Sequence, residues 1–219
     1  MSWRFIACAA LFVTCLLTAN VVAAKLVAVA GVVLPAAIVV FPLSYVVADV
    51  LTEVWGYAAA RRVIWLGFGC NLVMVAAVWA GGALPPAPFW TGQAAWDAIL
   101  GQTPRILGAS FAAYLVGEFT NAFTLARLKI ATEGRWLWTR TIGSTVVGQA
   151  VDSAVFVGLA FGGTVPAGAL VWIMAGQWAA KVLYEAAATP LTYAAVGWLK
   201  AREGVDAFDH RTDFNPLRF

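Results

Sequence analysis

The sequence predicts an all-α integral membrane protein with six transmembrane helices. Of its 219 residues, 62% are hydrophobic and 11% are charged, and the mean hydropathy is +0.82. Soluble domains contain about 45 to 50% apolar residues. The charged residues gather between apolar runs, and each run approaches the roughly 20 residues that a helix needs to cross a bilayer. Short alternating segments, which spanning β-strands require, are absent from the sequence.

The predicted spans cover residues 4–24, 33–54, 62–82, 105–126, 142–162 and 168–198. The last run is long enough to tilt or to extend beyond the membrane. The longest linker, Ala83 to Pro104, is rich in proline and tryptophan, which break helices and favour the membrane interface. It divides the chain into two three-helix halves. Residues 200–219 are predicted to form a polar cytoplasmic tail.

The basic residues predict the orientation. With the N-terminus inside, 11 of the 14 lysines and arginines are cytoplasmic: Arg4, Arg61, Arg62, Arg127, Lys129, Arg135, Arg140, Lys200, Arg202, Arg211 and Arg218. Lys25 and Arg105 are then outside, and Lys181 lies within a helix. This bias follows the positive-inside rule and predicts both termini in the cytoplasm. The net charge of +3 therefore reflects topology and gives no reason to expect a nucleic-acid partner.

The first run has an alternative interpretation. Arg4, the apolar stretch and the residues Val22 to Ala24 resemble a cleavable secretion signal. Cleavage would leave five spans and place the termini on opposite faces. The run is longer than the usual 7 to 15 apolar residues of a signal, and it contains Asn20.

Several kinds of chemistry are not expected. Cys8, Cys15 and Cys70 lie inside apolar runs without CxxC spacing, so we expect small buried side chains and no disulfide. The single histidine, His210, lies in the tail, which leaves no partner for a membrane hydrolase or a metal site. No phosphate-binding GxxxxGK[ST] motif occurs, so the chain has no ATPase of its own. We expect no cofactor and no metal.

Polar residues at membrane depth indicate a functional site. They are Asn20, Asp49, Glu53, Asn71, Glu118, Asn121, Gln149, Asp152, Gln177, Lys181 and Glu185. A charge at the centre of a bilayer helix costs roughly 2.5 to 3.5 kcal/mol, so such residues face a cavity, a partner or a pathway. Within a run they recur at helical spacing, and each helix can present its polar pair to one shared interior.

Each polar group also has a structural interpretation. Lys181 and Glu185 are spaced for a local ion pair, and Asp49 and Glu53 could lie at the cytoplasmic interface near Arg61. The remaining pairs, Glu118 with Asn121 and Gln149 with Asp152, could form interhelical hydrogen bonds worth about 0.6 kcal/mol each. An interfacial anchor is predicted at Arg135, Trp136, Trp138 and Arg140.

The two halves resemble each other weakly. Residues 44–49 align with residues 144–149, and Asn20 corresponds to Asn121. Two such three-helix repeats would have opposite orientations, which is the inverted-repeat arrangement of many secondary transporters. In that arrangement Pro42 would mark a kinked or broken second helix beside the site.

Several blocks of the chain resemble the queuosine precursor transporter family. They are residues 41–56, 117–121, 132–144, 148–152, 181–185, 189–193 and 214–216. The chain departs from the family pattern at Trp55, Gln149 and Leu217, and Gln149 stands where an acid is common. The resemblance implies uptake across the inner membrane of the cyano and aminomethyl forms of 7-deazaguanine, which are used to make queuosine in transfer RNA.

The polar residues suit such a ligand. One carboxylate of Asp49, Glu118 or Asp152 can accept the two parallel N–H donors of a guanine-like base, and Asn121 and Gln149 can complete the hydrogen bonding. Asn20 and Tyr45 join this predicted substrate site. A stacking face could come from Tyr45, Trp55, Phe119 or Trp178. Glu53 or Glu185 could carry a coupling proton.

Three other functions stay open at this point. The chain could be the substrate-binding membrane subunit of a multi-component vitamin importer, an intramembrane enzyme acting through Asp49 or Asp152, or a structural assembly protein. The density of intramembrane carboxylates argues against the last of these. A homodimer is a further expectation, because small six-helix transporters often pair.

Overall fold

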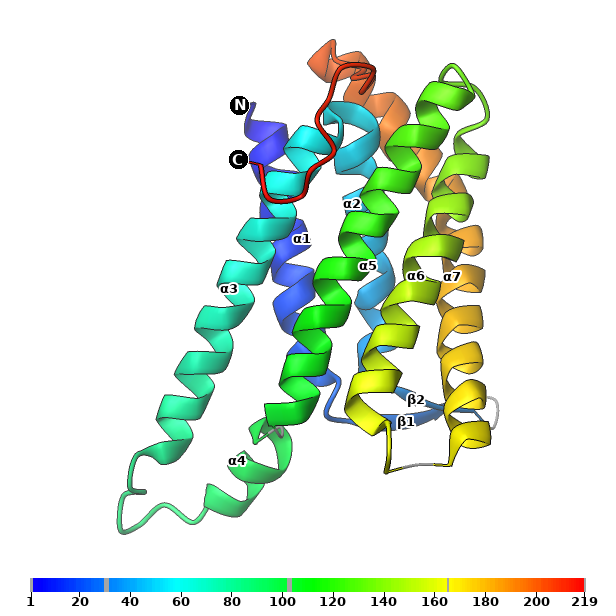
Figure 1. Ribbon diagram of the computed structural model, residues 1–219. Helices are drawn as coiled ribbons and strands as arrows, with labels where there is room; N and C mark the ends of the chain where they lie inside the picture. Colours follow the sequence, from blue (N-terminus) through cyan, green and yellow to red (C-terminus); the bar gives the residue numbers. More distant parts are fainter. Residues whose placement is uncertain (1, 30–31, 102–103, 165, 219) are drawn as a thin grey trace.

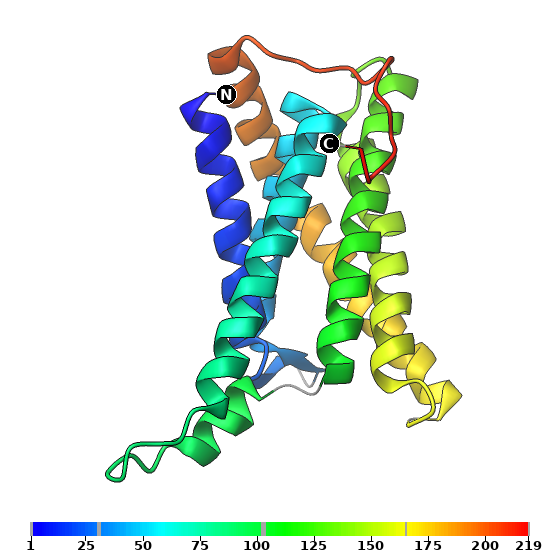
Figure 2. The same cartoon turned by 60° about the vertical axis from the view of Figure 1, so that its left-hand side comes forward.

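The computed structural model contains six long helices that run side by side (Figure 1). They are α1 (Trp3–Val22), α2 (Phe41–Trp55), α3 (Tyr57–Ala83), α5 (Pro104–Ala131), α6 (Leu137–Phe161) and α7 (Ala167–Glu203). The structure describes residues 2–29, 32–101, 104–164 and 166–218. The predicted helical membrane protein is confirmed in its class. Both termini lie at one end of the bundle, which we call the termini end (Figures 1 and 2).

The opposite end holds four short elements, among the described residues, that the sequence does not predict. Strands β1 (Leu26–Val29) and β2 (Val32–Pro35) form an antiparallel hairpin, and the 3-10 helix η1 (Ala36–Val39) follows it. The short helix α4 (Gln93–Leu100) lies in the linker between α3 and α5. We call this the hairpin end (Figure 1).

The second helix therefore differs from its prediction. A helix over residues 33–54 is wrong at its start, because strand β2 and η1 occupy residues 33–39 and α2 begins at Phe41. Pro42 lies in the first turn of α2, where the missing backbone N–H of proline would have no helical partner in any case. Pro42 starts the helix and does not kink it.

Helices α1, α3 and α6 are long and apolar enough to cross a membrane, judged by length and composition over the described residues. Helix α2 has only 15 residues, a length of about 22 Å against a hydrocarbon core of about 30 Å. Helices α5 and α7 are longer, with 28 and 37 residues, and carry charged side chains along their length. A set of six spans therefore remains a proposal.

Helix α2 lies at the centre of the packing. One face contributes Val47 and Leu51 to an apolar cluster with α1, α3 and α5. Val46, Val50 and Val54 belong to a second cluster with α6 and α7. Large apolar side chains also cover the outside of the bundle, where Trp172 is 80% exposed. A surface of this kind faces lipid without penalty.

Two glycines let α5 and α6 approach closely. A Cβ atom added at Gly117 of α5 would lie 2.8 Å from the Cβ of Asp152, and one at Gly148 of α6 would lie 2.8 Å from the Cβ of Asn121. Small residues at a helix interface allow such close backbone contact in membranes. The contact brings the polar residues of α5 and α6 to the same level.

We predict that Gly148→Ala lowers the stability of the solubilised protein. The added methyl group would overpack the α5–α6 interface, which typically costs about 1 to 3 kcal/mol. Gly158→Ala on the same helix is the matched control, because a Cβ atom there meets nothing within 4 Å. Thermal unfolding in detergent measures both variants. Equal melting temperatures for the two would show that the interface is looser than described.

Candidate functional site

Five buried polar side chains from four helices form the middle of the bundle. This central polar cluster comprises Asp49 of α2, Asn121 of α5, Gln149 and Ser153 of α6, and Glu185 of α7. Asn121 Nδ2 donates to Asp49 Oδ1 over 2.7 Å, and Asp49 interacts electrostatically with Glu185 and Glu118. On α6, Gly148 packs against Asn121, Gln149 is the next residue, and Ser153 lies one turn further along the helix.

Most of the acceptor atoms in this cluster have no hydrogen-bond partner among the described residues. They are Asp49 Oδ2, Asn121 Oδ1, Gln149 Oε1, Ser153 Oγ and both carboxylate oxygens of Glu185. A buried polar atom left unsatisfied costs about 1 to 3 kcal/mol, so several in one place are costly. In folded proteins such groups are paired by other protein groups, water, an ion or a ligand, so this cluster is a candidate binding site.

An ion pair borders the cluster. Lys181 Nζ of α7 lies 2.5 Å from Asp152 Oδ2 of α6 and 5.9 Å from the ring centre of Tyr45. The predicted local pair of Lys181 with Glu185 is wrong, because the lysine reaches across to α6 and leaves the Glu185 carboxylate near Asp49. Glu118 also interacts electrostatically with both members of the Asp152–Lys181 pair.

A small cavity lies beside Glu118 and Asn121. It measures about 10 Å³ and is lined by side chains of α1, α2, α3 and α5. This volume is close to the roughly 10 to 15 Å³ that a single water requires. A base would therefore need the helices around this cavity to move apart.

Glu53 lies one turn from Asp49 and has an entirely different environment. Arg140 of α6 donates from Nε to Glu53 Oε2 over 2.9 Å and from Nη2 to Oε1 over 2.8 Å. Lys200 Nζ of α7 donates to Oε1 over 2.7 Å. Lys129 Nζ of α5 lies 3.5 Å from Oε1 and also donates to the Glu53 carbonyl. Three cations from three helices therefore surround one fully buried carboxylate.

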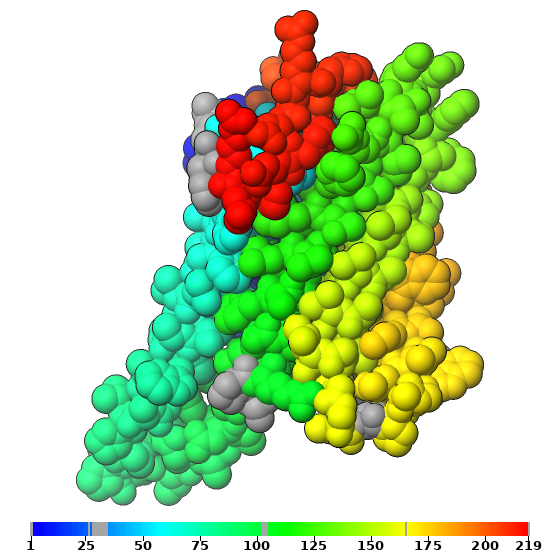
Figure 3. All heavy atoms as spheres, in the orientation of Figure 1, coloured from blue at the N-terminus to red at the C-terminus, as the bar shows by residue number. Residues whose placement is uncertain are grey.

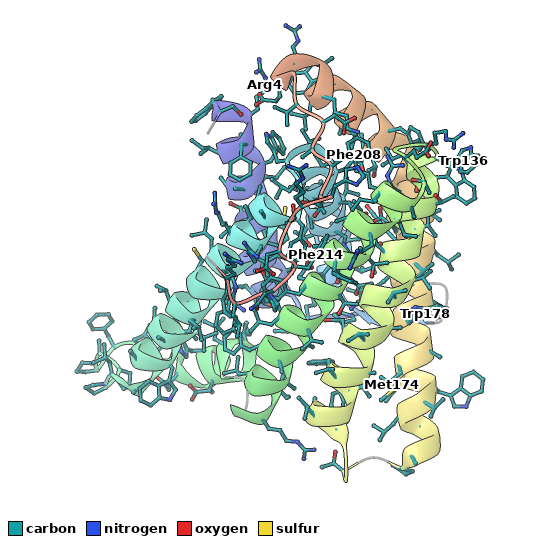
Figure 4. All side chains as sticks on the ribbon, turned by 45° about the horizontal axis from the view of Figure 1, so that its top comes forward. Arg4, Trp136, Met174, Trp178, Phe208 and Phe214 are labelled. Carbon is teal, nitrogen blue, oxygen red and sulfur yellow. The ribbon has the colours of Figure 1, made fainter. Side chains whose placement is uncertain are left out.

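This network corrects two predictions. Asp49 and Glu53 are buried and do not lie at a wet interface near Arg61, whose guanidinium instead donates to the carbonyls of Asp213 and Asn215. Arg140 is only 1% exposed and binds Glu53, so it is not an interfacial anchor. Trp136 is exposed and points away from the bundle, as an anchor would (Figure 4).

Asn20 does not join the central polar cluster. Its Nδ2 donates to Asn71 Oδ1 of α3 over 2.9 Å, near the hairpin end. Both residues line a separate pocket that contains no member of the cluster. Asn20 lies close to the C-terminal end of α1, whereas Asn121 lies further inside the longer α5, so the predicted correspondence of the two residues stays a prediction.

The stacking candidates also separate. Tyr45 is the one that borders the cluster, through Lys181. Trp55 packs edge-on against Phe5, and Phe119 lies 5.8 Å from the ring of Trp65. The indole of Trp178 donates to the carbonyl of Val146 on α6 (Figure 4). Within the described residues, no group of three or more His, Cys, Asp or Glu side chains could hold a metal ion.

Comparison with known proteins decides the family. Residues 35–195 match the family model described as "Putative vitamin uptake transporter", a match over more than half of the chain. The chain belongs to this family. The central polar cluster and the Glu53 network, which consists of Glu53, Lys129, Arg140 and Lys200, lie within or directly beside the matched region.

One curated relative of this family member is the "Probable queuosine precursor transporter" of Bacillus subtilis (strain 168). The two sequences are 31% identical over 148 residues, which cover 67% of this chain and 65% of the relative. The chain thus spans somewhat less than two thirds of that relative's length. No solved structure matches the chain.

The residues after α7, 205–218, form a C-terminal strap across the termini end. Tyr57 N donates to Asp209 Oδ2 over 3.0 Å, and its hydroxyl donates to the Phe214 carbonyl over 3.0 Å. The Phe214 ring lies 5.0 Å from the Tyr57 ring and below the guanidinium of Arg127. Figure 3 shows the strap in red against α3 and α5, and Figure 4 labels Phe208 and Phe214 along it.

Asp206 joins the strap to the Glu53 network. It accepts from Lys129 over 2.5 Å and lies 2.8 Å from Lys200. Partial burial raises the pKa of Asp206, but the hydrogen bonds from the two lysines outweigh burial and lower that pKa below its usual value. Because its pKa is lowered, ionised Asp206 stabilises the folded protein at every pH above the usual pKa of an aspartate. This stability is lost as the pH falls through the lowered pKa. At neutral pH, ionised Asp206 therefore binds the strap to Lys129 and Lys200.

Two features could not be found from the sequence. Ser153 is a hydroxyl in an apolar run, and only its burial beside Gln149 reveals it. The partners of Glu53 lie far from it in the sequence, and only the positive charge of Lys129, Arg140 and Lys200 gives a hint.

We predict that Glu53→Gln strongly destabilises the protein. The change leaves Arg140 and Lys129 buried without their central counter-charge, and breaking a buried pair typically costs about 3 to 5 kcal/mol. Glu133→Gln is the control, because Glu133 is exposed and pairs only with the exposed Arg135. Thermal unfolding in detergent compares the two. A melting temperature unchanged by Glu53→Gln would contradict the structural role of the network.

Proposed function

We propose that the chain imports 7-deazaguanine precursors of queuosine across the inner membrane by alternating access. The observation that carries the proposal is the set of unpaired, buried hydrogen-bonding atoms in the central polar cluster. Membership in a transporter family and the printed name of the Bacillus subtilis relative support the same function. In this proposal the six long helices are six spans, arranged as two inverted three-helix repeats.

The chemistry of the ligand matches the cluster. The Watson–Crick edge of a guanine-like base offers two parallel N–H donors and one carbonyl acceptor. Asp49 has a free Oδ2 for one of these donors, and its Oδ1 is already oriented by Asn121. Ser153 can donate its hydroxyl proton to the carbonyl. Bound base and protein would then leave fewer buried polar atoms unpaired, which favours binding.

Asp49 is favoured over the other predicted acids. Asp152 already accepts from Lys181, so using it for the ligand would break an ion pair. Glu53 is held by three cations and is unsuited to carry a coupling proton. Glu118 lies close enough to interact with Asp49, and it stays a second candidate for the base edge.

The charge distribution supports cytoplasmic termini. The termini end holds Arg4, Arg61, Lys129, Arg140 and Lys200 in ion pairs and hydrogen bonds with the tail and the helix ends. Basic residues favour the cytoplasmic side of a membrane. In this orientation, the Glu53 network and the strap close the cytoplasmic side, and alternating access requires them to open.

Glu185 is the proposed coupling group. Its carboxylate has no hydrogen-bond partner in the described structure and interacts electrostatically with Asp49. Two buried carboxylates near each other repel, and a proton on one of them relieves the repulsion. A proton taken up by Glu185 would thus leave Asp49 charged and ready to accept the base.

We predict that Asp49→Asn reduces uptake about tenfold or more, the loss expected when a hydrogen bond to a charged group is removed. Cells that cannot synthesise the precursor are given the labelled base, and accumulation is compared at matched expression. Glu118→Gln should also reduce uptake, whereas Asp152→Asn should act mainly through lower stability because it leaves Lys181 unpaired.

Glu133→Gln, at an exposed position, is the control and should transport normally. Normal uptake by both Asp49→Asn and Glu118→Gln would exclude the assigned site. The purified chain in liposomes provides a second check on the transporter mechanism. Flux that needs added proteins would show a substrate-binding subunit of a larger importer, and a chemically altered base after uptake would show an enzyme.

We predict that Glu185→Gln uncouples transport from the proton gradient. Exchange of labelled for unlabelled base across the liposome membrane should continue, because Asp49 still binds the base. Accumulation driven by an imposed pH gradient should be lost. Accumulation by the unsubstituted chain that persists after a protonophore is added would contradict this role. Normal accumulation by Glu185→Gln would contradict it as well.

A further inference from the structure

A second cavity lies near the hairpin end of the bundle. Its volume is about 320 Å³, within the range of roughly 300 to 1,000 Å³ of small-molecule sites, and far larger than the cavity of about 10 Å³ beside Glu118 and Asn121. Helices α1, α3, α4 and α5 line it. We call it the outer pocket. Its hydrogen-bonding and aromatic lining includes Asn20, Asn71, Trp79, Trp96, Asp97 and Ser110.

The lining has the chemistry that a flat heterocycle needs. Trp79 and Trp96 line the pocket, and indole rings are stacking partners for bases. Asn71 is only 4% exposed and holds the amide of Asn20 in place through a hydrogen bond of 2.9 Å. Asp97 adds a carboxylate, which accepts from Gln93 on the same helix over 2.9 Å. Apolar walls with a few placed polar groups are typical of ligand pockets.

Trp96 is built into the pocket by close packing. A Cβ atom added at Gly82 would lie 3.0 Å from the Trp96 Nε1 atom. A Cβ atom added at Gly81 would lie 3.4 Å from the edge of the same ring. The two glycines of α3 thus make room for the ring. Helix α4 has no fully buried residue, and it contacts this part of α3 through Trp96 and through Gln93, whose amide donates to the Gly82 carbonyl over 3.5 Å.

Along α5, Tyr114 lies between the residues that line the outer pocket and Asn121 of the central polar cluster. Phe111 lines the outer pocket, Tyr114 lies one turn further along α5, and Glu118 follows after one more turn. The Tyr114 hydroxyl donates to the Ile64 carbonyl of α3 over 2.9 Å and would lie 2.7 Å from a Cβ atom at Gly67. This bond ties α5 to α3 at the level between the two sites.

We propose that the outer pocket is a first binding site for a small planar heteroaromatic base, on the side of the membrane from which the base is taken up. The inference rests on the proposed function. The base stacks on Trp96, binds the polar lining, and moves to the central polar cluster when Tyr114 releases Ile64. The Glu53 network and the strap keep the opposite side closed meanwhile.

Equilibrium binding of labelled 7-cyano-7-deazaguanine to the purified full chain tests this site. In an Asp49→Asn background, where the central site is weakened, residual binding to the outer pocket should remain. Adding Trp96→Leu should then raise the Kd by about five- to a hundredfold, as expected for the loss of one base-stacking contact. Asp97→Asn, a nearly isosteric change at the pocket, should also weaken this residual binding.

Trp172→Leu is the matched control, because Trp172 is exposed on α7 and does not line the outer pocket. It should leave the Kd unchanged. An Asp49→Asn chain that binds no base, or that binds equally well with and without Trp96→Leu, would overturn the outer site while leaving the proposed function intact. An unsubstituted chain that binds no base would overturn both.

Labelling from outside the cell gives an independent readout. Ser110→Cys is introduced after alanine replaces Cys8, Cys15 and Cys70, and a membrane-impermeant maleimide is added to intact cells. The outer pocket predicts labelling that the base slows. Labelling only by a lipid-soluble maleimide, unaffected by the base, would show a lipid-filled groove and contradict the proposal.

Discussion

The bidentate pair of Glu53 with Arg140 is the constraint on which the packing of the termini end depends. A buried carboxylate is tolerated only when charges and hydrogen bonds compensate for its lost hydration. Here the compensation comes from Arg140 of α6, Lys129 of α5 and Lys200 of α7. One side chain of α2 therefore fixes three other helices. The strap joins the same network through Asp206.

The two carboxylates of α2, one turn apart, have opposite electrostatic environments. Glu53 is saturated by cations, whereas Asp49 keeps an unpaired oxygen and faces the Glu185 carboxylate. The cations around Glu53 favour one packed arrangement of the four helices. The unpaired oxygen of Asp49 is costly without a ligand or a proton. This arrangement suits the proposed transport. The residue proposed to bind the base, Asp49, and the residue proposed to close the cytoplasmic side, Glu53, lie one turn apart on the same helix.

The sequence predicts the helical membrane class and the set of buried polar residues, because hydropathy and helical spacing are local properties. It does not predict partners, since these depend on contacts between distant helices. Lys181 pairs with Asp152 and not with Glu185, and Arg140 is buried. Asn20 binds Asn71, away from the central polar cluster. The sequence also does not predict where α2 starts, because the apolar residues before Phe41 suit a strand as well as a helix. The inverted repeat stays a prediction.

We propose that Asp49 binds the donor edge of a 7-deazaguanine base. A cycle of four dissociation constants tests this contact: the base and its analogue without the 2-amino group, each with the unsubstituted chain and with Asp49→Asn. If the contact exists, either change alone weakens binding about tenfold or more, and the second change adds little once the first is made. Two losses that simply add would show that Asp49 does not bind that edge.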